Sequence, residues 1–113
     1  MAFRVTTFTQ VLSAAGGGNP VAYMPTDRNQ PAPSILINLS AGATLTYNVE
    51  VTGDDPTVPG YNPAIGNWFP FPGLAGLTAS QVGSLGALVS QVRVNITAYT
   101  SGNLMWQFVQ ALP

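Results

Sequence analysis

The stretch Ala43–Thr52, which reads ATLTYNVEVT, decides the fold because apolar and polar residues alternate along it without a break. One face would carry Leu45, Tyr47, Val49 and Val51, and the other Thr44, Thr46, Asn48 and Glu50. A period of two is typical of a strand that buries one face. The stretch therefore predicts a half-buried β-strand.

The same alternation recurs in the last quarter of the chain. Between Leu88 and Thr100 the apolar residues are Val92, Val94, Ile96 and Ala98. The closing segment Leu104–Ala111 is apolar on both faces, so we expect it to be covered on both sides, with Trp106 in the core. Thr100–Asn103 contains a glycine suited to a short hairpin turn, and it predicts that these two strands pair directly with each other.

Weaker patterns predict the remaining elements. Phe3–Leu12 and Ser34–Leu39 are rich in β-branched and other apolar residues and are expected to be strands. Pro20–Met24 is a candidate short edge strand. Trp68–Phe71 contains Pro70 and is followed by Pro72. Because proline has no backbone N–H for a ladder, the segment is expected at a sheet edge or in a loop. Thr78–Val89 could hold one or two turns of helix behind a threonine or serine cap.

Ten prolines and twelve glycines are spread through the chain, which disfavours long helices. Gly16-Gly17-Gly18 lacks the lysine and the following helix of a phosphate-binding loop and is interpreted as a flexible linker. The chain is expected to be all-β, an antiparallel β-sandwich of jelly-roll type with long loops rich in proline and glycine. Residues 1–113 would form one domain, with residues 1–33 as an extended or loop-rich arm.

Charge is the unusual feature of the composition. Charged residues make up 6% of the chain, lysine is absent and the net charge is -1, whereas about 25% charged residues is typical. A soluble monomer usually relies on surface charge to stay dispersed, so we infer that this chain works within an assembly. Arg4, Arg28 and Arg93 are scattered, which argues against nucleic-acid binding. No apolar run is long enough for a membrane helix, and no signal peptide is recognisable.

The sequence offers little chemistry. Histidine and cysteine are absent, so the common general bases, thiol nucleophiles and zinc ligands are missing, and we expect a protein that is not an enzyme and has no cofactor or metal. Asp54-Asp55 with Asp27 could in principle hold a hard cation, although an Asp-Asp-Pro turn is more often simply solvated. Glu50 is interpreted as a surface residue.

The segment Trp68-Phe69-Pro70-Phe71-Pro72 is the most apolar of the predicted loops. Aromatic side chains on loops often anchor protein interfaces. The alternative is that the segment folds down and plugs one end of the sandwich. Trp68 and Phe71 could do both.

Three motifs carry a resemblance to a known family: Val49–Pro56 followed by Trp68, then Leu77–Ser80, and Val92–Gly102. Together they resemble the capsid decoration, or cement, proteins of tailed bacteriophages over roughly the C-terminal 70 residues. The N-terminal third has no counterpart. The resemblance implies a jelly-roll-like fold bound to the outside of the major capsid shell.

The resemblance also implies a partner and a location. The chain would bridge neighbouring major capsid proteins on the outer surface of the virion and would associate with itself, as a dimer in preference to a trimer. Independently of the resemblance, we expect the N-terminal strand and two loops to contact the capsid and a sister copy, through Phe3, Met24, Arg28, Trp68, Phe69 and Phe71. Two alternatives remain: a tail or fibre module that binds a receptor or carbohydrate through Trp68 and Tyr61, and a tail-tube or connector subunit.

Overall fold

The computed structural model describes residues 5–18, 20–22, 33–54, 57–60, 62, 66–85 and 91–111, and within this part of the chain every regular element is a strand. The strands are β1 (Val5–Leu12), β2 (Gly16–Gly17), β3 (Val21–Ala22), β4 (Ser34–Leu39), β5 (Thr44–Thr52), β6 (Phe69–Pro70), β7 (Gln81–Ser84), β8 (Gln91–Ser101) and β9 (Leu104–Ala111). No helix among the described residues is long and apolar enough to cross a membrane.

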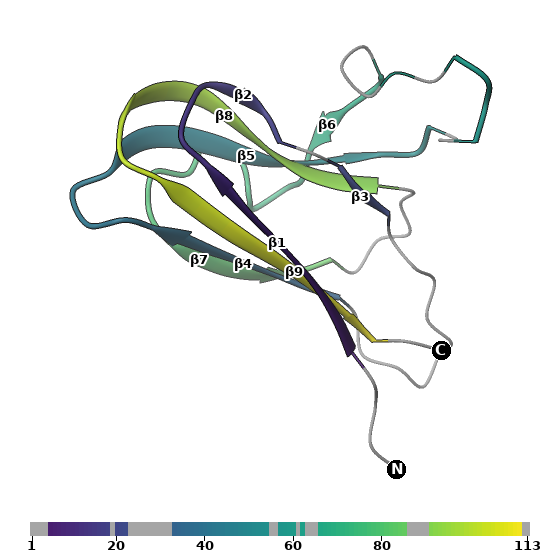
Figure 1. The fold of residues 1–113 in the computed structure, drawn as a ribbon, viewed down its shortest axis with the longest axis horizontal. Coiled ribbons are helices and arrows are strands. Elements are labelled where there is room, and N and C mark those ends of the chain that lie inside the picture. Colours follow the sequence, from purple (N-terminus) through teal and green to yellow (C-terminus); the bar gives the residue numbers. More distant parts are fainter. Residues whose placement is uncertain are drawn as a thin grey trace.

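The strands form two antiparallel sheets that face each other (Figure 1). Sheet A has the order β1-β9-β4-β7. In sheet B the order is β2-β8-β5-β6, and β3 also pairs with β8. The all-β sandwich is therefore confirmed, while the jelly-roll subclass stays a prediction. Residues 1–33, expected as an arm, contribute β1, β2 and β3 to the two sheets.

The core lies between the sheets and is built from the inward-facing residues of the alternating strands. Leu45, Tyr47 and Val49 of β5 meet Trp106 and Phe108 of β9, and all five are buried. Trp106 is fully buried, as expected, and its indole N–H donates to Gln10 Oε1 over 3.0 Å. The outward-facing side chains of β9 are only half-buried, so the expectation that both faces of this strand are covered does not hold within the described residues.

The expectation that the last two strands form a hairpin is wrong. β8 pairs with β5 in sheet B, whereas β9 lies between β1 and β4 in sheet A. The turn at Gly102 (φ 93°) is therefore a corner that carries the chain from one sheet to the other. The physical reason is that both strands have a strongly apolar face, and placing them in opposite sheets lets both faces reach the same core.

Three such corners lie at the same end of the sandwich: between β1 and β2, between β4 and β5, and between β8 and β9 (Figure 1). The last two are bonded to each other. The Ser40 N–H donates to the Asn103 carbonyl over 2.9 Å, and the Asn103 N–H donates to Ser40 Oγ over 2.9 Å. The Ala43 N–H donates to the Ser40 carbonyl and closes the β4–β5 corner.

Two further expectations need correction. The helical turns proposed for Thr78–Val89 are not found in the described part of that range, where β7 pairs with β4 instead, and residues 86–90 lie outside the described residues. The glycine triplet is not a linker, because Gly16 and Gly17 pair with Ile96 and Asn95 of β8, and the Gly18 N–H donates to the Val94 carbonyl. The edge positions expected for residues 20–24 and 68–71 are confirmed by β3 and β6 in the part described.

Candidate interaction surfaces

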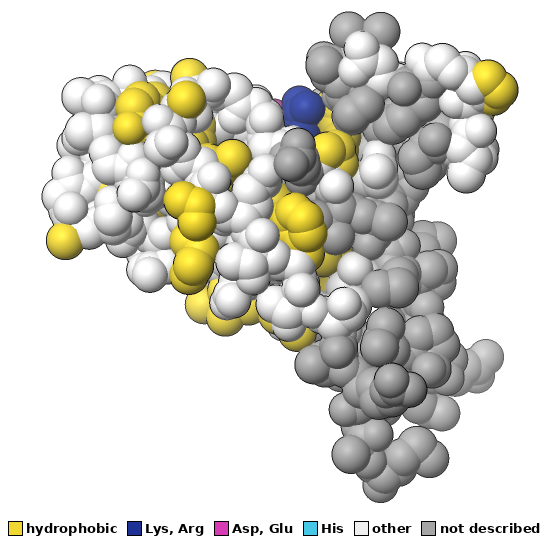
Figure 2. Space-filling model, in the orientation of Figure 1, with side chains coloured by type: hydrophobic (Ala, Val, Ile, Leu, Met, Phe, Trp, Pro, Cys, Tyr) yellow, Lys and Arg dark blue, Asp and Glu magenta, His cyan; other side chains and the backbone are white. Residues whose placement is uncertain are grey.

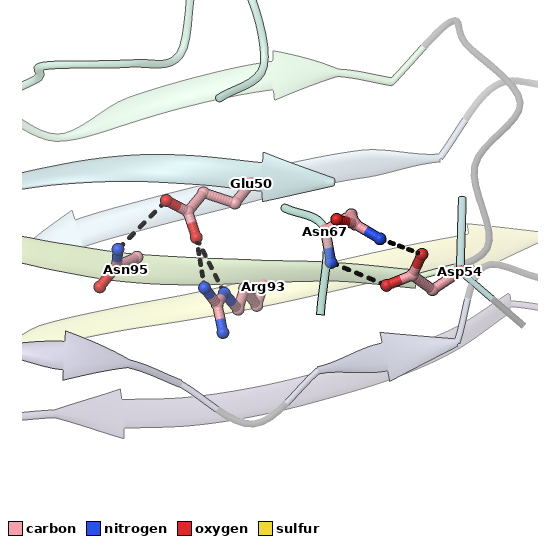
Figure 3. Close-up of polar contacts among 5 residues, drawn as sticks. All are labelled: Glu50, Asp54, Asn67, Arg93 and Asn95. Carbon is pink, nitrogen blue, oxygen red and sulfur yellow. Dashed lines mark hydrogen bonds and ion pairs between the residues drawn. The ribbon is translucent and has the colours of Figure 1, made fainter. Parts of the chain in front are cut away.

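The outer face of sheet B carries a compact polar cluster (Figure 3). Glu50 of β5 and Arg93 of β8 are directly paired in the ladder. Arg93 Nε and Nη2 each lie 2.8 Å from Glu50 Oε1, and the Asn95 side-chain amide donates to Glu50 Oε2 over 3.1 Å. Glu50 is only 7% exposed, so its interpretation as a surface residue is wrong.

Two neighbours cover the Arg93 side chain. The guanidinium carbon lies 4.3 Å from the centroid of the Trp68 ring, a cation–π contact. β2 also pairs with β8, and a Cβ placed on its Gly17 would lie 2.9 Å from Arg93 Nη1. Glycine therefore lets the backbone of β2 pass close to the guanidinium. This structural role of the triplet was not predictable from the sequence, because glycines show no alternation of apolar and polar residues.

The aspartate of the candidate cation site has a local structural role. Asp54 accepts the backbone N–H of Asn67 over 2.7 Å and its side-chain amide over 3.1 Å (Figure 3). These bonds, the backbone one first, hold the pKa of the Asp54 carboxyl below its usual value. Asp27 and Asp55 lie outside the described residues, and within the described part no three metal-ligating side chains come together.

The aromatic segment divides its residues between core and surface. Phe71 packs against the core, and its N–H donates to the Val49 carbonyl over 2.8 Å. Trp68 is half-buried and engaged with Arg93. Phe69, in contrast, is 61% exposed on β6 at the edge of sheet B. The segment thus lies along β5 at the edge of sheet B, and within it the side chain of Phe69 is exposed and could contact another protein.

The outer face of sheet A differs sharply from that of sheet B because it carries no charged residue among those described. Strand pairing and alternation place eleven side chains on it: Thr7, Thr9, Val11, Ser34, Leu36, Asn38, Val82, Ser84, Met105, Gln107 and Val109. Val11 is 58% exposed and Val82 67% exposed. We call this surface the uncharged face.

Figure 2 shows the sandwich from the side. Hydrophobic side chains are spread over the strands, and the dark blue atoms gather beside β6. They belong to Arg93, the one lysine or arginine among the described residues.

A shallow hollow of about 230 Å³ is lined by Thr44, Thr46, Thr78 and Thr100 with neighbouring Ala43, Leu45 and Ala98. It contains no aromatic or charged side chain that would orient a sugar or an ion.

The structure describes three of the six residues expected at the interface. Trp68, Phe69 and Phe71 lie in one segment, and Phe69 is the exposed member. Phe3, Met24 and Arg28 lie outside the described residues, as does Tyr61 of the alternative sugar platform. Sequence reasoning missed the uncharged face, although the apolar residues on both faces of Phe3–Leu12 and Leu104–Ala111 were a signal for it.

Comparisons with known proteins add little to this description. No family model matches the chain, and no curated protein matches it. Among solved structures, a chain from the Bacillus endospore appendages, which form a family of disulfide-linked pili, is similar over 100% of this chain and 93% of its own length, with 12% sequence identity and a TM-score of 0.36. At that TM-score the likeness supports no statement about function.

Proposed function

We propose that this chain is a structural protein of a virus particle, a capsid decoration protein that stabilises the shell by bridging neighbouring major capsid subunits. The observation that carries the proposal is the uncharged face. A permanent interface needs exposed apolar groups and few charges, because each unpaired charge that it buries opposes association. Val11, Leu36, Val82, Met105 and Val109 supply such groups among neutral polar side chains.

The low charge of the whole chain supports the same role. Dispersed monomers benefit from net charge, whereas a protein that stays bound to a shell does not need it. Phe69 would add an aromatic anchor at the edge of sheet B, in keeping with the enrichment of aromatic residues at interface centres. The capsid is proposed as the partner because Val49–Pro56, Leu77–Ser80 and Val92–Gly102 resemble motifs of phage decoration proteins.

The test is binding of the purified protein to expanded capsid shells that lack it. We expect saturable binding at a fixed ratio to the major capsid protein and a rise in the temperature at which the shell comes apart. Binding to tails or to cell-surface glycans without binding to shells would overturn the proposal and favour the receptor-binding alternative.

Charge variants connect the test to the uncharged face. Val82→Lys should weaken shell binding by roughly tenfold or more, because it places an unpaired charge in the interface. Thr44→Lys is the matched control, since Thr44 is exposed on the outer face of sheet B. Equal effects of the two variants would show that the uncharged face does not contact the shell.

A further inference from the structure

The four sheet edges of the described structure are unequal. Sheet A ends in β1 and β7, and sheet B ends in β6 on one side and in β2 and β3 on the other. An edge strand exposes a row of backbone N–H and C=O groups and can pair with another chain unless its sequence prevents this. Proteins prevent it with short strands, prolines, charged residues or bulges.

Three of the edges carry such protection. β6 has two residues, one of them Pro70, and β2 and β3 have two residues each. β7 has four residues and is interrupted by Gly83. β1 has none of these features: its eight residues, VTTFTQVL, include no charge, proline or glycine, and all eight are in regular register with β9.

We propose that β1 pairs with β1 of a second copy of this chain, antiparallel, about a two-fold axis at Phe8. Phe8 would then lie opposite its counterpart, and Thr7 opposite Thr9 of the other copy. The two-fold axis must pass through a residue and not between two residues. Opposed residues in an antiparallel ladder point to the same side of the sheet, whereas successive residues of one strand point to opposite sides. Phe8 is chosen because it creates an aromatic pair next to Trp106, whose ring centroid lies 5.3 Å from that of Phe8.

A second copy suits this edge better than a charged peptide does. The two-fold axis brings each residue of β1 close to its own kind, and a strand without charge pairs with itself without repulsion. The assembly stops at the dimer, because each copy has one unprotected edge in the described structure and the dimer buries the β1 edges of both copies. The two sheets A would join into one eight-stranded sheet, and the two uncharged faces would become continuous.

The inference rests on the edge of sheet A and not on shell binding. A dimer in free solution can be detected whether or not the protein binds capsids, so failure of one proposal leaves the other open to its own test. The measurement is sedimentation velocity of the purified chain over a concentration series. We expect a species of twice the chain mass of 11.8 kDa; a monomer at all concentrations up to the millimolar range would overturn the proposal.

Cross-linking tests the register. The chain has no cysteine, so introduced thiols are unique. Thr7→Cys and Thr9→Cys, each exposed on the outer face, should form a disulfide-linked dimer when mixed and oxidised, and much less when either is oxidised alone. Thr44→Cys mixed with Thr46→Cys is the matched control on β5. No cross-link in the mixture would overturn the pairing, and faster cross-linking of Thr9→Cys alone would overturn the axis at Phe8.

A charge swap separates loss of pairing from loss of folding. The double variant Thr7→Lys/Thr9→Lys should be monomeric, with dimerisation weakened at least about tenfold by opposed like charges. Thr7→Glu/Thr9→Glu should be monomeric for the same reason. Mixing the two should restore a dimer that contains one copy of each. A lysine variant that still dimerises, or a mixture that stays monomeric, would contradict the proposed register.

Discussion

Glu50 on β5 and Arg93 on β8 face each other across the ladder, and their side chains meet at 2.8 Å beneath the ring of Trp68. Both side chains are largely buried, at 10% and 15% exposure. This pair joins the two central strands of sheet B to the β2 edge and to the segment that follows Gly66.

The two side chains of this pair should be energetically coupled, so that the effects of removing each do not add. Glu50→Gln should lower the free energy of unfolding by about 2 kcal/mol, because Arg93 is left largely buried without its carboxylate. The double variant Glu50→Gln/Arg93→Met should lose less than the two single variants together. Denaturant unfolding of all three proteins measures the coupling, with Ser84→Ala as an exposed control. Strict additivity would mean that the pair contributes nothing to stability.

Alkaline pH should destabilise the protein through Tyr47. Burial raises the pKa of Tyr47 from 10.0 to about 12, and its hydroxyl donates to the Ala79 carbonyl over 2.7 Å. Between these two pH values the unfolded chain loses the proton and the folded chain keeps it. The free energy of unfolding should therefore fall by about 1.4 kcal/mol per pH unit between pH 10 and 12.

The matched variants for this prediction are Tyr47→Phe and Tyr99→Phe. Tyr47→Phe should cost about 1 kcal/mol at neutral pH and should flatten the alkaline fall, since the titrating hydroxyl is gone. Tyr99→Phe should retain the fall, although it removes the bond from its hydroxyl to the Gly102 carbonyl. Stability measured from pH 8 to pH 12 decides the matter; an unchanged slope in Tyr47→Phe would assign the effect to other groups.

The corner between β8 and β9 should tolerate no side chain at Gly102. A Cβ there would lie 2.5 Å from the Ala43 Cβ and 2.6 Å from its Cα, and φ is 93°. Gly102→Ala should cost about 3 kcal/mol or more. Gly42→Ala, in the neighbouring corner, meets open space and should cost about 1 kcal/mol from its φ of 76° alone. Equal melting temperatures for the two variants would contradict this packing.

Phe69 and Phe71 should separate binding from folding. Phe71→Ser removes a side chain packed against the core and should lower stability by about 2 kcal/mol. Phe69→Ser should change stability by less than about 0.5 kcal/mol, because the side chain is 61% exposed. If Phe69 anchors the shell interface, its variant should bind shells more weakly while its thermal unfolding is unchanged. Full binding by a stable Phe69→Ser would remove Phe69 from the interface.

Most strands could be predicted from alternation alone. Thr44–Thr52 and Ser34–Leu39 are strands with the predicted faces, since burial of one face imposes a period of two on the sequence. Alternation does not say which strand is the neighbour. The turn at Gly102 fits a hairpin and a corner equally well, so the partners of β8 and β9 could not be chosen from local residues.

The surfaces were harder to predict than the strands. The position of Glu50 on a polar face was predictable, but its burial depends on Arg93, 43 residues later, and on the Trp68 segment. The glycine triplet gives no periodic signal, and its pairing with β8 is visible only in three dimensions. The uncharged face depends on strand order, because residues from four separate strands compose it.

The cross-sheet corners have a consequence for how the chain reaches its native state. Every ladder joins distant residues: even the closest, between β5 and β6, pairs Val51 with Phe69, and the β1–β9 ladder pairs Val5 with Ala111. Among the described residues no ladder closes a short local hairpin, which is typical of slow-folding all-β proteins. β9 separates β1 from β4, so β1 cannot join sheet A before β9 has left the ribosome, although β4 and β7 can pair earlier. Until then β1 lacks the strand it pairs with in the native sheet, and an unpaired strand without charge is prone to aggregate.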